Sequence, residues 1–180
     1  MKTKKKLFVV IVAFSVIATF VVGVFHLNAQ TVPMIEKRIG NTVYELDTAR
    51  YILKNKTNKI THEEYSYGGC VVAFDNDKQA HEDWLENFKP VFSKERAEEL
   101  NVRIRITCIF DLIGQIQEIE IFFRNREDFE MFTLSEIKTI EDAIKKHQYR
   151  NLSWHNCGNL KYGYFSHPLN PYLLYFEKSK

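Results

Sequence analysis

The fold is decided by residues 102–123, which read VRIRITCIFDLIGQIQEIEIFF. From Val102 to Phe110 every second residue is apolar, which is the period of a strand with one buried face. Asp111 to Gly114 predicts a turn, because Asp accepts hydrogen bonds from the nearby backbone and Gly adopts a positive φ without strain. Ile116 to Phe123 then predicts the return strand, so we expect an antiparallel hairpin.

Charged residues lie on the polar face of this hairpin. Arg103 and Arg105 belong to the first strand, and Glu118 and Glu120 belong to the second. We expect Glu118 to face Arg105, and Glu120 to face Arg103, across the hairpin. Exposed pairs of this kind stabilise a sheet by only a few tenths of a kcal/mol.

Helices and one strand are predicted on the N-terminal side of the hairpin. Residues 41–53 place apolar side chains at helical spacing, while Thr42-Val43-Tyr44 is also compatible with the start of a strand. A strand is predicted over residues 65–74. A helix is predicted over residues 75–89, ended by the proline that follows. Ser93 has a side chain that can cap a second, short helix.

The C-terminal side predicts one more helix and three strands. Thr133 and Glu136 have the spacing of a capping box, and isoleucines follow at helical spacing. Strands are predicted over residues 150–154, 160–165 and 172–177. The whole order predicts an α+β fold, with a mainly antiparallel sheet and helices packed on one of its faces.

Residues 90–151 resemble the C-terminal domain of TonB. In that family a proline precedes a short helix, a strand of alternating apolar residues, an Asp-x-x-Gly turn, a second strand, a helix and an aromatic strand. Here the order is carried by Pro90, the 102–123 hairpin, the helix from Ser135 and Tyr149-Arg150-Asn151. The resemblance implies a hairpin–helix–strand core and a sheet edge that adds an extended peptide as a further strand. The sequence lacks TonB's long proline-rich spacer, so energy transduction to outer-membrane receptors is not implied.

The N-terminus has the order of a secretory signal peptide. Lys2, Lys4, Lys5 and Lys6 precede an apolar run over residues 7–25, and Leu27-Asn28-Ala29-Gln30 follows. We therefore predict a signal peptide over residues 1–29, cleaved after Ala29, and export to the periplasm or the cell surface. The alternative is an uncleaved anchor, since the apolar run approaches the ~20 residues that span a bilayer. The chain then resembles the short exported proteins of Bacteroidetes, many of whose families are uncharacterised.

Composition predicts one domain and no nucleic-acid partner. Removing residues 1–29 from the 180 leaves 151, enough for one compact domain, which we place at residues 33–178. Four of the 25 basic residues lie in the removed segment, so 21 remain against 23 acidic ones. A domain with this balance lacks the basic surface that nucleic acids require.

Three cysteines leave several possibilities open. Cys108 lies in the apolar row of the first hairpin strand, so we interpret it as a buried small hydrophobic residue. If a disulfide forms, Cys70 and Cys157 are the favoured pair, although the sequence does not fix connectivity. The other interpretations of Cys157 are an unpaired turn residue and a nucleophile activated by His155.

Two further segments are weak candidates for sites. Asp75, Asp77, His81, Glu82 and Asp83 cluster in the sequence, but carboxylates also favour a helix N-terminus, and we expect no metal there. Asp47-Thr48-Ala49 matches the pattern on which exported Bacteroidetes proteins are O-glycosylated, so Thr48 is a candidate acceptor.

We expect a non-enzymatic domain, without a cofactor, that binds a protein or another component of the cell envelope. The predicted C-terminal strand is the expected edge for strand addition, through Tyr172, Leu174, Tyr175 and Phe176. One alternative is a cysteine-dependent enzyme that uses Cys157 and a histidine. Another is a structural surface protein held in the membrane by residues 7–25.

Overall fold

A computed structural model describes residues 34–176, except 67–69, 75–76, 148 and 150–151. The predicted signal peptide, or anchor, lies outside these residues. Within the described residues, no helix has the length and apolar character needed to cross a bilayer.

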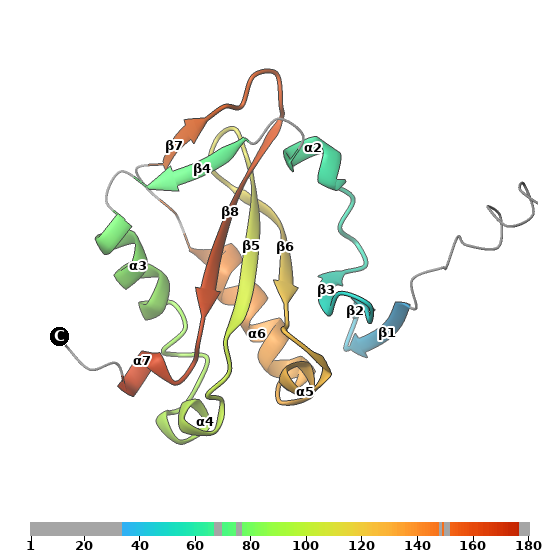
Figure 1. The fold of residues 1–180 in the computed structure, drawn as a ribbon, viewed down its shortest axis with the longest axis vertical. Coiled ribbons are helices and arrows are strands. Elements are labelled where there is room, and N and C mark those ends of the chain that lie inside the picture. Colours follow the sequence, from blue (N-terminus) through green and yellow to red (C-terminus); the bar gives the residue numbers. More distant parts are fainter. Residues whose placement is uncertain (1–33, 67–69, 75–76, 148, 150–151, 177–180) are drawn as a thin grey trace, which may run out of the picture. The chain divides into compact units, whose positions relative to one another are not determined.

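The described residues form an eight-stranded sheet with the strand order β1-β2-β3-β6-β5-β8-β4-β7 (Figure 1). Neighbouring strands are antiparallel, except that β4 and β8 pair in parallel. The mainly antiparallel α+β fold is therefore confirmed. The strands are β1 (Met34–Ile39), β2 (Thr42–Asp47), β3 (Ile52–Asn55), β4 (Val71–Phe74), β5 (Ile104–Asp111), β6 (Ile116–Phe122), β7 (Leu152–His155) and β8 (Tyr162–Leu169).

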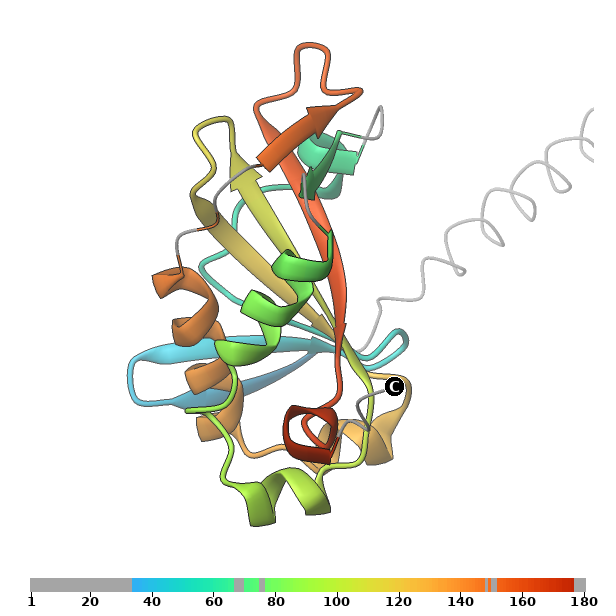
Figure 2. The ribbon, with the colours of Figure 1, turned by 90° about the vertical axis from the view of Figure 1, so that its left-hand side faces the viewer.

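Helices cover the two faces of the sheet unequally. The inner face carries Ile106 and Cys108 of β5 and packs against α3 and α6, whereas α2 packs on the opposite, outer face, where the Tyr65 ring lies 5.8 Å from the Tyr164 ring. The expectation that all helices share one face is thus wrong for α2. Figure 2 shows the β1–β2 hairpin turned across the central strands toward α6. The helices are α2 (His62–Ser66), α3 (Asp77–Glu86), α4 (Lys94–Glu99), α5 (Arg126–Glu130), α6 (Leu134–Lys146) and α7 (Leu173–Phe176).

The β5–β6 hairpin is confirmed, but its register differs from the prediction. One oxygen of Asp111 accepts hydrogen bonds from the Ile113 and Gln115 backbone N–H groups, at 3.1 and 2.9 Å. The turn is closed by a hydrogen bond from the Asp111 backbone N–H to the Gln115 carbonyl. The pairing then shifts between Ile109 and Phe110, because β6 has one extra residue there, Gln117. Consequently Arg105 lies opposite Phe122, and neither predicted Arg–Glu pair lies face to face.

Residues 41–53 form strands β2 and β3, so the predicted helix is wrong. The Asp47 side chain accepts hydrogen bonds from the Ala49 and Arg50 backbone N–H groups, which closes a turn between the strands. Tyr51 completes it with a φ of 52°. The strand period is visible in burial, because Tyr44 and Leu46 are buried while Val43, Glu45 and Asp47 are half-buried.

The predicted strand over residues 65–74 is shorter than expected. Tyr65 belongs to helix α2, and only Val71–Phe74 forms a strand. β8, in contrast, is longer than the predicted strand and continues to Leu169, because all of its residues pair with β5.

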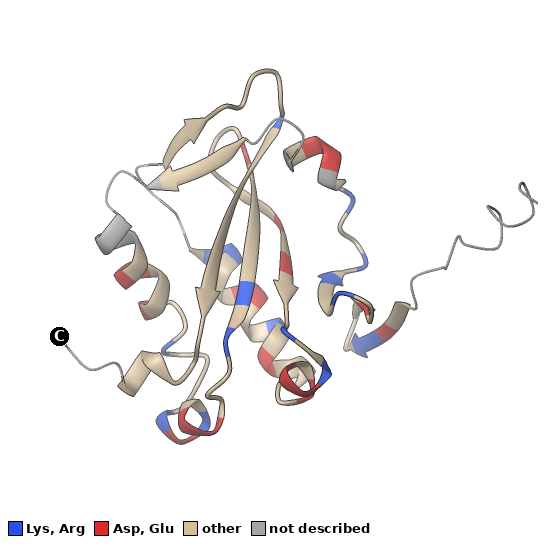
Figure 3. Cartoon of the chain, viewed as in Figure 1, with Lys and Arg blue, Asp and Glu red and all other residues tan. Residues whose placement is uncertain are grey.

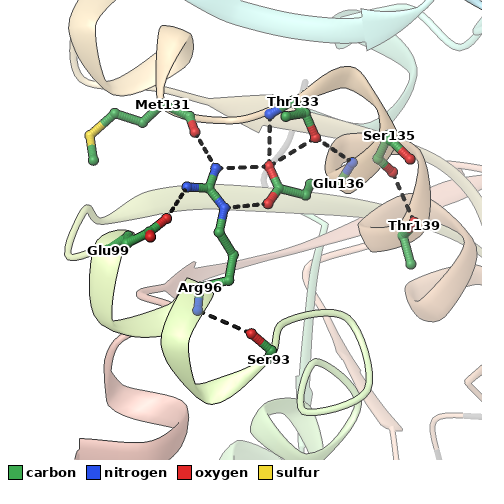
Figure 4. A network of polar contacts seen from close by, with 8 residues as sticks. All are labelled: Ser93, Arg96, Glu99, Met131, Thr133, Ser135, Glu136 and Thr139. Atoms are coloured by element: carbon green, nitrogen blue, oxygen red, sulfur yellow. Dashed lines mark hydrogen bonds and ion pairs between the residues drawn. The ribbon is translucent and has the colours of Figure 1, made fainter.

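The predicted helix starts at Ser93 and Thr133 are confirmed, and the two helices are joined to each other (Figure 4). Ser93 accepts a hydrogen bond from the Arg96 backbone N–H, and Thr133 and Glu136 form a reciprocal capping box. Arg96 then donates to both Glu136 oxygens and to the Met131 carbonyl. The same carboxylate thereby caps α6 and binds α4.

Candidate functional site

A groove of about 910 Å³ lies on the outer face of the sheet. This volume is near the upper end of the ~300–1,000 Å³ typical of ligand sites. Its floor comes from β3, β5, β6 and β8, and its walls come from residues 58–65 and from the ends of β1 and β2. The lining residues used below are Asp47, Lys54, Lys59, Tyr65, Arg105, Thr107, Glu120, Phe122, Tyr164 and Ser166.

One wall of the groove is the segment before α2, and buried polar contacts fix it to the sheet. The Glu118 carboxylate, only 8% exposed, accepts hydrogen bonds from the Lys59 and Ile60 backbone N–H groups. The Asn58 side chain donates to the Ile119 carbonyl at 3.1 Å. The wall is therefore held by β6 itself, and Glu118 serves this purpose instead of pairing with Arg105.

Aromatic and hydroxyl groups line the end of the groove near α2. The Tyr65 hydroxyl donates to Glu120 at 3.3 Å, and burial, followed by the Glu120 charge, raises the pKa of Tyr65. Thr107 donates to the Ser166 hydroxyl at 3.0 Å. This end offers aromatic ring surface together with hydroxyl groups that stay neutral at physiological pH.

Basic residues outnumber acidic ones in the groove: Arg50, Lys54, Lys59 and Arg105 line it against Asp47, Glu63 and Glu120. Asp47 also accepts backbone hydrogen bonds, and Glu120 accepts one from the Tyr65 hydroxyl. The side chains of Arg105 and Lys54 form no hydrogen bond or ion pair with any described residue, and Arg105 is exposed. Figure 3 shows basic segments on β5 and acidic segments on the neighbouring β6. The groove is thus suited to an anionic ligand.

A disulfide joins Cys70 to Cys157, with the two Cα atoms 4.1 Å apart. The Cys70 carbonyl accepts a hydrogen bond from the backbone N–H of Tyr164, whose ring lines the groove. The bridge therefore supports the strand that carries Tyr164. Cys108 is a free, fully buried cysteine, and burial raises the pKa of its thiol.

The disulfide occupies Cys157, the residue proposed as the nucleophile of a cysteine enzyme. The Sγ atom of Cys157 is bonded to Cys70 and so presents no thiolate. His155 is exposed at the end of β7.

The acidic cluster near α3 is only partly within the described residues, because Asp75 and the Asp77 side chain lie outside them. Among the described residues, no group of three or more His, Cys, Asp or Glu is placed to hold a metal. His81 instead contacts His167, with Nδ1 and Nε2 2.7 Å apart. Burial, then the charges of His81 and Arg103, lower the pKa of His167 to about 4.

Thr48 lies in the turn between β2 and β3, where its side chain is half-buried. The helix in which we expected it does not form. O-glycosylation of Thr48 stays a prediction.

The predicted C-terminal edge strand is wrong. Residues Leu173–Phe176 form the short helix α7, so this segment has no strand edge to offer. Leu174 is 7% exposed, and the Tyr175 hydroxyl donates to the carbonyls of Lys89 and Phe92. These contacts hold Tyr172–Phe176 against the loop before α4. The outermost strands of the described sheet are β1 and β7.

Comparisons with known proteins support the fold. No protein-family model and no curated protein matches the chain. The structure is similar to that of a DUF5043 family protein from Bacteroides uniformis ATCC 8492. The two have 19% sequence identity and a TM-score of 0.60, over 78% of this chain and 93% of that one. A likeness at this identity establishes a shared fold and no more. It agrees with the predicted resemblance to Bacteroidetes proteins, while the resemblance to TonB stays a prediction.

Proposed function

We propose that this chain is an exported, non-enzymatic binding domain, and that its outer-face groove holds an acidic segment of an envelope protein. The proposal rests chiefly on one observation: four basic residues line the groove against three acidic ones, and the side chains of Lys54 and Arg105 have no partner among the described residues.

The arrangement of the groove floor favours an extended peptide. Arg105, Phe122 and Ile52 lie opposite one another on three adjacent strands, and Lys54 and Glu120 form the next row. Each row therefore has one basic side chain, beside apolar side chains in the first row and beside Glu120 and Thr107 in the second. A peptide with alternating acidic and apolar side chains would match both kinds of contact.

The predicted export of the chain supports an extracytoplasmic partner. The predicted signal peptide places the domain in the periplasm or at the cell surface, and an uncleaved anchor would leave it at the membrane. In either case the groove meets components of the envelope.

A binding measurement with a defined probe tests this function. The probe is a fluorescent peptide of alternating Glu and Val, and its control is a peptide of alternating Lys and Val. We expect saturable binding of the acidic peptide that weakens as salt concentration rises, because exposed charges are screened. Equal binding of both peptides, or of neither, would contradict the proposal.

Charge reversal locates the site. The double variant Lys54→Glu/Arg105→Glu is expected to weaken binding of the acidic peptide about tenfold or more. The matched control is Lys146→Glu/Lys161→Glu, which also reverses two exposed charges, neither of which lines the groove. Equal losses in both variants would show that the peptide responds to net charge and not to the groove.

A further inference from the structure

The β1 edge of the sheet suggests a second interaction, distinct from ligand binding, although Met34 at the start of β1 also lines the groove. We propose that β1 pairs antiparallel with β1 of a second copy of this chain, so that the two sheets continue into one another.

β1 is a formed strand whose outer side has no partner among the described residues. It pairs with β2 along its whole length, from Met34 opposite Asp47 to Ile39 opposite Thr42. Gly40, at a φ of 55°, and Asn41 form the two-residue connection that such hairpins favour. The strand is therefore held ready to pair on its other side.

The start of β1 exposes apolar side chains, which edge strands usually avoid. Met34 and Ile35 are each 45% exposed, whereas Ile39 at the other end packs against the core. A second strand that covers Ile35 would remove this surface from water, which favours association.

Symmetry restricts how two copies of β1 can pair. A two-fold axis perpendicular to the sheet keeps equivalent faces together, so opposing residues must lie on the same face. Centring the axis on Glu36 would place Glu36 opposite itself. Centring it on Lys37 places Ile35 opposite Ile39 and Glu36 opposite Arg38, each pair occurring twice.

The register centred on Lys37 matches apolar with apolar and acidic with basic side chains. It covers the exposed Ile35 with the core-packed Ile39 of the second copy, and it sets Glu36 against the opposite charge of Arg38. Only Lys37 meets its own copy, at the axis. Charged residues normally protect an edge strand from pairing, but here their order makes the edge complementary to itself.

Sedimentation velocity tests this dimer. The chain is produced with its own N-terminal segment, so that the exporting cell determines the processed form, and is measured from about 1 μM to about 1 mM. We expect a reversible monomer–dimer equilibrium in this range, because a single strand pair makes a small interface. A monomer at every concentration would overturn the proposal.

Charge-swap variants identify the register. Glu36→Arg places Arg opposite Arg twice and is expected to weaken the dimer about tenfold. The double variant Glu36→Arg/Arg38→Glu restores unlike pairs and should return the dissociation constant to within about threefold of the original. If the double variant dimerises no better than Glu36→Arg, this register is wrong.

One control separates the dimer from a contact within the chain. Lys56 is the ion-pair partner of Glu36 in the same copy, and both side chains are about half exposed. Lys56→Ala removes that pair and should leave dimerisation unchanged, whereas an equal loss would show that Glu36 acts only within its own chain. Circular dichroism and melting temperature confirm that each variant is folded. Because the groove residues are untouched, peptide binding should persist in Glu36→Arg.

Discussion

Arg96 donates hydrogen bonds to both carboxylate oxygens of Glu136, at 2.6 and 3.1 Å, and so joins α4 to α6. The same carboxylate accepts the Thr133 backbone N–H at 2.7 Å as part of the α6 capping box. The Glu136 side chain thus caps the first turn of α6 and also holds α4 in place (Figure 4).

Arg96→Lys should lower the free energy of unfolding by about 1–2 kcal/mol. A lysine keeps the charge but cannot make the paired contact with Glu136 while also reaching the Met131 carbonyl. Urea denaturation measures the change. Lys138→Arg is a suitable control, because it alters a side chain that pairs only with a neighbouring turn of α6, through Asp142, and should leave stability nearly unchanged.

Stability should fall between pH 6.5 and about 4 in part because of His167. Its pKa is 6.5 ordinarily and about 4 in the folded chain, so the unfolded chain binds the proton more strongly in this window. The contribution is therefore full above pH 6.5 and is lost as pH falls toward 4. His167→Phe should flatten this part of the curve of unfolding free energy against pH, and an unchanged slope would contradict the assignment.

Loss of the Cys70–Cys157 disulfide should lower stability by about 2–5 kcal/mol, because the bridge closes a loop of 87 residues. Reduction, or Cys157→Ser, tests this by thermal denaturation. A second test is to unfold the protein without a reductant, alkylate it and measure its intact mass. One thiol should be modified, namely Cys108. Three modified thiols without a reductant would show that the bridge does not form.

Gly163→Ala should destabilise the fold by about 1–3 kcal/mol through overpacking. A Cβ atom at this position would lie 2.5 Å from the Trp154 ring, 2.9 Å from Val72 and 3.0 Å from the Cys70 sulfur. Gly40→Asn is the comparison, because space is open there and Asn tolerates a positive φ. Its melting temperature should change much less.

The local elements of this protein could be predicted from sequence because short-range contacts determine them. Ser93 and Thr133 cap helices through residues three positions away, and Asp111 closes its own turn. Alternation from Ile104 to Phe110 placed the core side of β5 correctly, and the burial of Trp84 on α3 and of Phe88 just after it followed from their spacing.

The errors arose where one segment satisfied two patterns. Residues 41–53 have apolar side chains at a spacing that suits a helix, but the Asp47 turn divides them into two strands. Residues 172–176 are aromatic and apolar like a strand, yet Tyr175 is held by carbonyls more than eighty residues away in the sequence. The secondary-structure preference of residues 172–176 could not reveal these distant hydrogen-bond acceptors.

The sequence by itself determined the capped helices, the central hairpin and the α+β class, since periodicity and capping act within a few residues, while the export signal stays a prediction. Only the tertiary structure decided the strand order, the register that leaves Arg105 opposite Phe122, and the outer-face groove. It also made β1 an outermost strand. These features depend on pairing between residues far apart in the chain, and many registers are compatible with the same local pattern.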